Sequence, residues 1–189
     1  MKYKAKSKSI VLNLGAWNVR TLMDNPKSKR PERRTALVAK ELARYNIDIA
    51  ALSETRLEDT GLLEEKSIGY TFFWSGRSNK ERRTSGVGFA IKSNIANKLT
   101  KQPTGLNDRL MTLNIPLSRK KNATLISAYA PTMTNDDETK DKFYEDLDHI
   151  ITSVNPTDKL IILGDFNARV DTGSKTWEGT LGNHGVGKT

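Results

Sequence analysis

Short apolar segments rich in β-forming residues recur along the chain, and their spacing constrains the fold more than any other feature of the sequence. Each is short enough to be one strand and is bounded by polar or glycine-containing stretches. The segments predicted to be strands are residues 10–17, 47–52, 70–74, 87–91, 110–115, 123–129 and 159–163. The Lys-rich residues 118–122 predict a hairpin turn between the fifth and sixth strands.

Two stretches between these strands have helical periodicity instead. Residues 32–45 and 136–154 repeat apolar side chains on one helical face, and the second begins with Asp136, Asp137 and Glu138. Acidic residues are favoured in a first helical turn because they oppose the helix dipole. Strand, helix and strand in succession over the first part of the chain indicate a βαβ unit with parallel strands. The pattern therefore predicts an α/β fold.

Length and composition exclude several classes of protein. The chain has 189 residues, which suggests one domain, and no cysteine, which excludes a disulfide scaffold, a Cys-ligated zinc site and thiol catalysis. No apolar stretch approaches the ~20 residues that span a bilayer. Residues 1–9 form a basic leader without the apolar core of a signal peptide. We expect an intracellular protein with one domain over residues 10–189.

Positive charge is concentrated in a few clusters. The formal net charge is +9, with basic clusters in residues 27–34, 77–83 and 119–121, whereas residues 136–148 are acidic. Clustered cations suit a polyanionic partner, most commonly nucleic acid. A solvated basic surface explains the charge equally well, so charge alone leaves both interpretations open.

Polar residues gather where the predicted strands end. They are Asn18, Glu54, Tyr129, Asp165 and Asn167. Each alone is more typical of a turn, but α/β folds build sites at one edge of the sheet, where strand ends meet. Carboxylate and amide oxygens are ligands of hard divalent cations, so the set predicts a Mg²⁺ or Mn²⁺ site.

Four ordered motifs carry a resemblance to a known family. They are Trp17-Asn18-Val19-Arg20, Leu52-Ser53-Glu54-Thr55-Arg56, Ser127-Ala128-Tyr129-Ala130-Pro131 and Leu163-Gly164-Asp165-Phe166-Asn167-Ala168. From residue 10 onward the chain resembles the endonuclease/exonuclease/phosphatase superfamily. It resembles in particular the apurinic-type endonuclease domains of non-LTR (RTE/BovB-like) retrotransposons and the craniofacial development protein 2-like proteins derived from them. The resemblance implies a DNase I-like fold, a four-layer αββα sandwich of two mixed sheets.

The resemblance also implies roles for the strand-end residues. Glu54 matches the family's metal-binding glutamate, and Asn18 the asparagine that completes the metal and phosphate network. Tyr129 matches the tyrosine that contacts the scissile phosphate or helps to activate the nucleophile. Asp165 matches the aspartate that orients or deprotonates the attacking water, and Asn167 the phosphate-binding asparagine.

Five basic residues are candidates for binding nucleic acid: Arg77, Lys80, Arg82, Arg83 and Arg109. The first four lie in one basic cluster, which we expect to form a loop beside the site and grip DNA phosphates. Arg109 opens a strand where the family often has arginine, and a surface salt bridge is an equally good explanation of it.

The chain departs from the family pattern in two places. Arg20 stands where some members carry an acidic residue, which argues against a second metal site nearby. The family's later Asp and its Ser-Asp-His motif do not occur before Thr189, so we expect a domain truncated at its C-terminus. Neither His149, inside a predicted helix, nor His184, in a glycine-rich stretch, fits the missing histidine.

The sequence also contains a match to the pattern of a phosphate-binding loop. Residues 182–189 satisfy G-x-x-x-x-G-K-T, but the preceding residues are polar and no helix can follow before the end of the chain. Because the motif needs a helix N-terminus to receive the phosphates, we interpret the match as coincidental.

The sequence therefore predicts Mg²⁺-dependent phosphodiester hydrolysis by a DNA endonuclease of retrotransposon type, poorly active as this chain alone. A catalytically dead nucleic-acid-binding remnant and a phosphatase of the same superfamily are the alternatives. We expect a nuclear location, DNA as the partner, and neither a membrane nor a small-molecule cofactor. The sequence does not indicate the oligomeric state.

Overall fold

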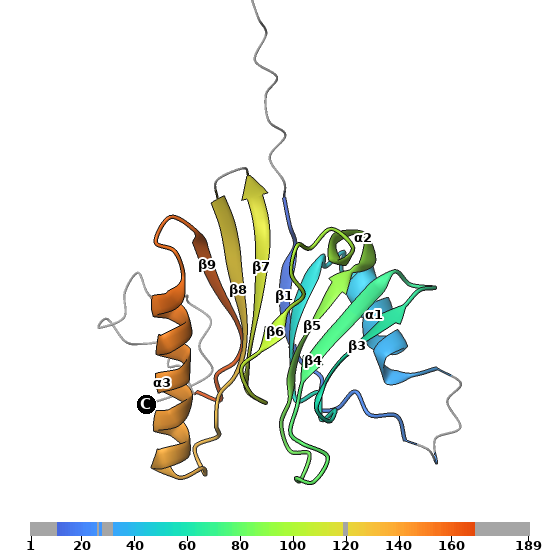
Figure 1. Ribbon diagram of the computed structural model, residues 1–189. Helices are drawn as coiled ribbons and strands as arrows, with labels where there is room; N and C mark the ends of the chain where they lie inside the picture. Colours follow the sequence, from blue (N-terminus) through green and yellow to red (C-terminus); the bar gives the residue numbers. More distant parts are fainter. Residues whose placement is uncertain (1–10, 26, 28–31, 119–120, 169–189) are drawn as a thin grey trace, which may run out of the picture.

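A computed structural model describes residues 11–25, 27, 32–118 and 121–168, which form two β-sheets covered by helices (Figure 1). The predicted leader 1–9 and the glycine-rich stretch 182–189, which includes His184, lie outside the described residues. Among the helices in the described part of the chain, none is long and apolar enough to cross a lipid bilayer.

The first sheet has five strands in the order β1-β2-β5-β4-β3. Its strands are β1 (Leu14–Asn18), β2 (Ile49–Ser53), β3 (Thr60–Glu65), β4 (Tyr70–Ser75) and β5 (Val87–Lys92). Strands β1 and β2 are parallel and the other neighbours are antiparallel, so the sheet is mixed. The parallel pair is joined through helix α1 (Arg34–Arg44), as the predicted βαβ unit requires.

The second sheet has four strands in the order β6-β7-β8-β9. Its strands are β6 (Thr104–Gly105), β7 (Leu110–Ser118), β8 (Lys121–Tyr129) and β9 (Lys159–Asp165). The hairpin β7–β8 is antiparallel, whereas β8 and β9 are parallel and joined through helix α3 (Asp137–Ser153). This second parallel pair brings the ends of β8 and β9 to one edge of the sheet.

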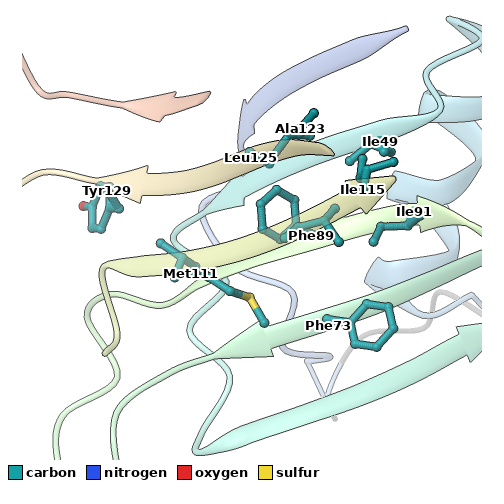
Figure 2. Close-up of a cluster of buried hydrophobic side chains, with 12 residues drawn as sticks. Ile49, Phe73, Phe89, Ile91, Met111, Ile115, Ala123, Leu125 and Tyr129 are labelled. Carbon is teal, nitrogen blue, oxygen red and sulfur yellow. The ribbon is translucent and has the colours of Figure 1, made fainter. Parts of the chain in front are cut away.

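The main apolar core lies between the two sheets (Figure 2). The buried residues that form it are Ile49, Ala51, Phe73, Val87, Phe89 and Ile91 from the first sheet and Met111, Leu113, Ile115, Ala123, Leu125 and Tyr129 from the second. Side chains alternate along each strand: in β2, Ile49 and Ala51 face this core, whereas Ala50 and Leu52 face α1. The buried Ser127 hydroxyl donates to the Leu52 carbonyl at 3.4 Å and joins the sheets directly.

A helix covers the outer face of each sheet, as Figure 1 shows. Val38, Ala39 and Leu42 of α1 pack on the first sheet, and Phe143 and Leu147 of α3 pack on the second. Helix α3 begins as predicted: Asp136 accepts a hydrogen bond from the Thr139 amide at 2.7 Å and caps the helix. The predicted α/β sandwich of two mixed sheets with helices outside is confirmed.

Three elements were not predicted from the sequence: β3, β6 and the short helix α2 (Ser93–Ala96). Strand β3 lies at the edge of its sheet, and its residues alternate between exposed and half-buried. An edge strand pairs on one side only and needs no continuous apolar run, so its sequence resembles a loop. Strand β6 has only two residues, which is too short to give a periodic signal.

Candidate active site

The candidate site forms where four strands end. Asn18 is the last residue of β1, Glu54 follows β2, Tyr129 ends β8 and Asp165 ends β9. The registers of the paired strands set these positions. Asn18 on β1 pairs with Ser53 on β2, the residue before Glu54, and Tyr129 on β8 pairs with Asp165 on β9. Because β1 also lies against β9, the packing of the sheets brings the two strand-end pairs together.

Asn18 joins the two carboxylates of the site. Its Nδ2 donates to Oε1 of Glu54 at 2.8 Å and to Oδ2 of Asp165, 147 positions further along the chain than Asn18, at 2.9 Å. Its Oδ1 accepts from the Arg20 backbone amide at 3.0 Å. In this orientation the nitrogen of Asn18 faces the carboxylates and its oxygen is turned away. Its assignment as a metal ligand stays a prediction.

Three donors hold the Glu54 carboxylate in its ionised form. Burial by itself would raise the pKa of Glu54, but hydrogen bonds from Asn18, Arg56 and Tyr129, together with the Arg56 charge, lower the pKa below its usual value. The Arg56 Nη2 lies 2.9 Å from Oε2 of Glu54. A carboxylate of this kind stays charged at neutral pH and can bind a cation.

Tyr129 is buried at the inner end of the site. Burial, followed by the nearby Glu54 charge and the hydrogen bond to it, raises the pKa of Tyr129 above its usual value. The phenol therefore stays protonated at neutral pH and acts as a hydrogen-bond donor. The Arg109 guanidinium lies over its ring, 5.4 Å from the ring centroid, and donates to the Tyr129 carbonyl at 3.3 Å.

Asp165 and Asn167 form a compact turn after β9. The Asn167 backbone amide donates to Oδ1 of Asp165 at 3.0 Å, and its side-chain amide donates to the Ala130 carbonyl at 2.7 Å. Gly164 is required before this turn, because a Cβ at that position would collide with the backbone of Ala128 on β8. The Gly-Asp-Phe-Asn sequence thus holds a carboxylate and an amide at a fixed position.

Left-handed backbone conformations cluster around the site. Arg20, Glu54, Arg56 and Asn167 have φ values of 60°, 54°, 56° and 48°. Such values are uncommon outside glycine and cost of order 1–3 kcal/mol each where the residue is not Asn or Gly. Of the four, Asn167 is the residue type that tolerates this conformation best. The clustering marks the site independently of residue type, and no sequence pattern indicated it.

The basic loop of residues 77–83, predicted to grip DNA phosphates, is only partly available for binding. Arg77 lies 3.0 Å from Oδ2 of Asp108, and Arg83 forms an ion pair with Glu58. Lys80 and Arg82 are exposed, and no side-chain ion pair engages them within the described part of the chain. The structure therefore divides the four into two residues with intramolecular partners and two open to solvent.

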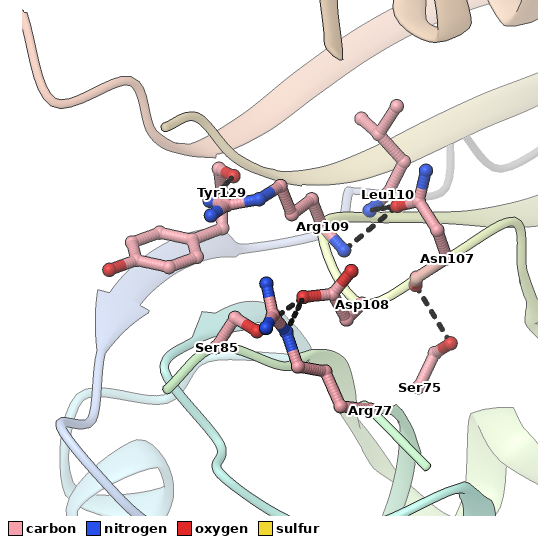
Figure 3. Close-up of polar contacts among 8 residues, drawn as sticks. All are labelled: Ser75, Arg77, Ser85, Asn107, Asp108, Arg109, Leu110 and Tyr129. Atoms are coloured by element: carbon pink, nitrogen blue, oxygen red, sulfur yellow. Dashed lines mark hydrogen bonds and ion pairs between the residues drawn. The ribbon is translucent and has the colours of Figure 1, made fainter. Parts of the chain in front are cut away.

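Asp108 organises a polar cluster that the sequence did not indicate (Figure 3). Its carboxylate accepts from the Ser85 hydroxyl and from Nε of Arg77. Burial would raise its pKa, but the Ser85 and Arg77 contacts and the Arg109 charge lower the pKa of Asp108 below its usual value. Arg109, the next residue along the chain, is directed to Tyr129 and forms no salt bridge with the described residues. Within the described residues no salt bridge accounts for Arg109, and its role in binding nucleic acid stays a prediction.

The donor set suits one hard divalent cation. Among the described residues no group of three or more His, Cys, Asp or Glu side chains converges, but Glu54 and Asp165 place carboxylate oxygens within 3 Å of the same nitrogen. Mg²⁺ is commonly bound through one or two carboxylates, with water and substrate phosphate completing its shell. Glu54 and Asp165 therefore fit such an ion, with oxygen ligands and no thiolate.

Histidine takes no part in this arrangement. His149, the one histidine among the described residues, is exposed on α3. Among the described residues, the groups at this site that could transfer a proton are the two carboxylates and the Tyr129 phenol.

Comparison with known proteins gives a consistent assignment. The model of the family described as "Endonuclease/Exonuclease/phosphatase family" matches residues 15–189. Craniofacial development protein 2 of Bos taurus is 32% identical over 174 residues, which cover 92% of this chain and 27% of that protein. The Tragulus javanicus protein of the same name is also 32% identical over 174 residues, covering 92% of this chain and 28% of that protein. The chain thus spans about a quarter of the length of these relatives.

Solved structures share the fold at lower identity. The catalytic domain of APE2 from Xenopus laevis has a TM-score of 0.53 and 20% identity, covering 86% of this chain and 62% of that chain. An AP endonuclease from Archaeoglobus fulgidus has a TM-score of 0.53 and 20% identity, covering 84% of this chain and 58% of that chain. Humanized TDP2 of D. rerio has a TM-score of 0.56 and 16% identity, covering 84% of this chain and 67% of that chain. These likenesses confirm the predicted DNase I-like architecture.

Proposed function

The chain belongs to the endonuclease/exonuclease/phosphatase family, and on this premise we propose that its site hydrolyses phosphodiester bonds in DNA with the help of a divalent cation. One observation carries the proposal: Asn18 gathers Glu54 and Asp165 around a single amide nitrogen, at 2.8 and 2.9 Å. Two ionisable carboxylates at such close range are tolerable when a donor or a cation lies between them. The site therefore combines a cation-binding position with a group able to accept a proton.

Each residue has a distinct role in this proposal. Asp165, held by Asn167, orients the attacking water and accepts its proton. Tyr129, kept protonated by burial and by Glu54, has one O–H, which turns from Glu54 to a phosphate oxygen as charge develops there. The Asn167 side chain lies beside the same position and binds the phosphate.

Glu54 and Asp165 are the residues that would hold Mg²⁺ or Mn²⁺. Such an ion neutralises charge on the phosphate oxygen and lowers the pKa of bound water. The donor set supports this assignment, because it offers hard oxygen ligands. Asn18 would become a ligand only if its amide rotated to present Oδ1.

DNA is the proposed substrate because exposed cations lie in the loop whose last residues, Ser85 and Gly86, bond to the backbone next to Glu54. Lys80 and Arg82 are free of side-chain ion pairs within the described residues and lie in the loop that follows β4. Two proteins of similar fold are named with DNA: D. rerio TDP2 with a single-strand DNA product, and the Neisseria 3′ phosphatase NExo with a product DNA hairpin. The four motifs support a retrotransposon-type endonuclease, and a DNA substrate in turn supports a nuclear location.

A nicking assay on supercoiled plasmid tests the proposal. We expect slow nicking with Mg²⁺ or Mn²⁺ and none with EDTA. The Asp165→Asn variant should lose ~10²–10⁴-fold in rate, the range for one acid–base group, while Glu54 still binds the metal, although more weakly than in the wild type. Glu54→Gln should lose both metal binding and cleavage. Glu41→Gln, which changes an exposed acid on α1, is the matched control and should nick like the wild type.

DNA binding by the wild type without any metal-dependent cleavage would contradict the proposal and favour the non-catalytic alternative. Release of phosphate from a 3′-phosphorylated oligonucleotide, with no nicking of plasmid, would favour the phosphatase alternative. We expect the chain alone to bind DNA more readily than it cleaves it, because its described site contains no histidine to assist proton transfer.

A further inference from the structure

Arg56 is fixed by its backbone in a position directly over the site. Its amide donates to the Ser85 carbonyl at 2.9 Å, and the preceding residue, Thr55, donates to the Gly86 carbonyl at 3.0 Å. The Thr55 carbonyl accepts from the Leu22 amide at 2.8 Å. With neighbouring segments bonded on both sides, the left-handed conformation of Arg56 is locked, and its side chain is directed back to Glu54.

The Arg56 guanidinium is incompletely satisfied in this position. A guanidinium has five N–H donors, and within the described part of the chain one hydrogen bond, to Glu54, engages it. Its Nε is buried and has no partner, while the side chain as a whole is 42% exposed. A group that is anchored but largely unbonded is suited to a second partner that carries several acceptors.

We infer that Arg56 couples metal binding to nucleic-acid binding. In the metal-free site its guanidinium takes the place of a cation on Glu54. When a divalent cation binds Glu54, the guanidinium is released and contacts a phosphate of the nucleic acid. This inference rests on the proposed function, since it requires a metal at Glu54 and a phosphodiester beside it.

Charge and geometry support the exchange. Glu54 has two carboxylate oxygens: Oε1 is held by Asn18, and Oε2 by Arg56. A metal that takes Oε2 competes with the guanidinium directly, and the two positive charges repel each other across the same carboxylate. A phosphate can offer the planar guanidinium two oxygens, whereas Glu54 offers it only Oε2.

Metal titration provides the first test. Mn²⁺ binding is measured without DNA for the wild type, Arg56→Met and Arg56→Lys. Removing the competing cation should tighten Mn²⁺ binding by about fivefold, the upper range for an ion pair half open to solvent. Arg56→Lys keeps the charge and should stay near the wild type. Arg44→Met, which breaks an Arg–Glu pair of 2.7 Å on α1, is the matched control and should change nothing.

The salt dependence of DNA binding provides the second test, with a labelled phosphorothioate duplex that resists cleavage. In EDTA the log–log slopes of wild type and Arg56→Met should coincide, because Arg56 is held by Glu54. With Mn²⁺ the variant's slope should be shallower by about 0.9, the value of one phosphate contact. Far-UV circular dichroism and thermal melting confirm that each variant is folded.

Four results would overturn the inference. Weaker Mn²⁺ binding by Arg56→Met would show that Arg56 merely orients Glu54. An equal loss of slope with and without Mn²⁺ would make Arg56 a permanent phosphate contact, and no loss in either condition would leave it without a role in DNA binding. Absence of Mn²⁺ binding by the wild type would refute the proposed function as well, whereas Mn²⁺ binding abolished by Glu54→Gln would preserve that function even if the coupling failed.

Discussion

Replacing Asn18 with leucine tests whether one amide holds the two halves of the site together. Leucine has similar volume but no donor, so Glu54 and Asp165 would face each other with nothing between them. The variant loses two hydrogen bonds to carboxylates, at 2.8 and 2.9 Å. Bonds to charged groups contribute about 1.5–3 kcal/mol each, and partial exposure of the site favours the lower end. We expect a loss of about 3 kcal/mol in the free energy of unfolding.

The loss in free energy of unfolding should depend on pH. The pKa of Glu54 is lowered in the folded protein, so its ionisation stabilises the fold above the unfolded pKa of ~4.3 and this stability is lost as pH falls through the folded pKa. In Asn18→Leu the pKa of Glu54 should rise, because a lowering hydrogen bond is gone. The destabilisation should therefore be greatest at neutral pH and decrease in acid, where the two carboxyl groups can share a proton.

Urea unfolding followed by far-UV circular dichroism, without metal, measures this effect. With a slope of about 1–3 kcal/mol per molar urea, a loss of 3 kcal/mol moves the midpoint by about 1–3 M at pH 7.5. Asn13→Leu is the control, because Asn13 donates to the Asn46 carbonyl, a neutral group at the other end of β1. A midpoint shift in Asn18→Leu no larger than in this control, or one that is equal at pH 7.5 and pH 4, would refute the reasoning.

Three further perturbations separate packing, buried charge and phosphate contact. Phe89→Ala removes a fully buried ring from the core between the sheets and should cost about 3–5 kcal/mol in urea unfolding. Arg77→Gln leaves Asp108 with too few donors and should cost about 1–2 kcal/mol at neutral pH, less in acid, as measured by thermal melting at both pH values. The double variant Lys80→Gln, Arg82→Gln should melt like the wild type while the salt slope of DNA binding becomes shallower by about 0.9 per lost contact.

The elements with strong periodicity and the identity of the strand-end residues could be predicted from the residues alone. Apolar runs such as 159–163 and the amphipathic stretch 136–154 yield β9 and α3 because burial of one face is a local property of the sequence. Strand β3 was not predicted, because an edge strand with one half-buried face lacks a continuous apolar run. The residues Asn18, Glu54, Tyr129 and Asp165 were identifiable because each ends or follows a recognisable strand.

How these residues are used depends on the tertiary fold. Asn18 and Asp165 are 147 positions apart, and the packing of β1 against β9 makes them partners. Other long-range contacts select which cations remain available, because Asp108 and Glu58 engage Arg77 and Arg83. An ion pair depends on distances across the fold, which residue spacing does not encode. The residue types thus set the chemistry of the site, whereas long-range contacts set its charge balance.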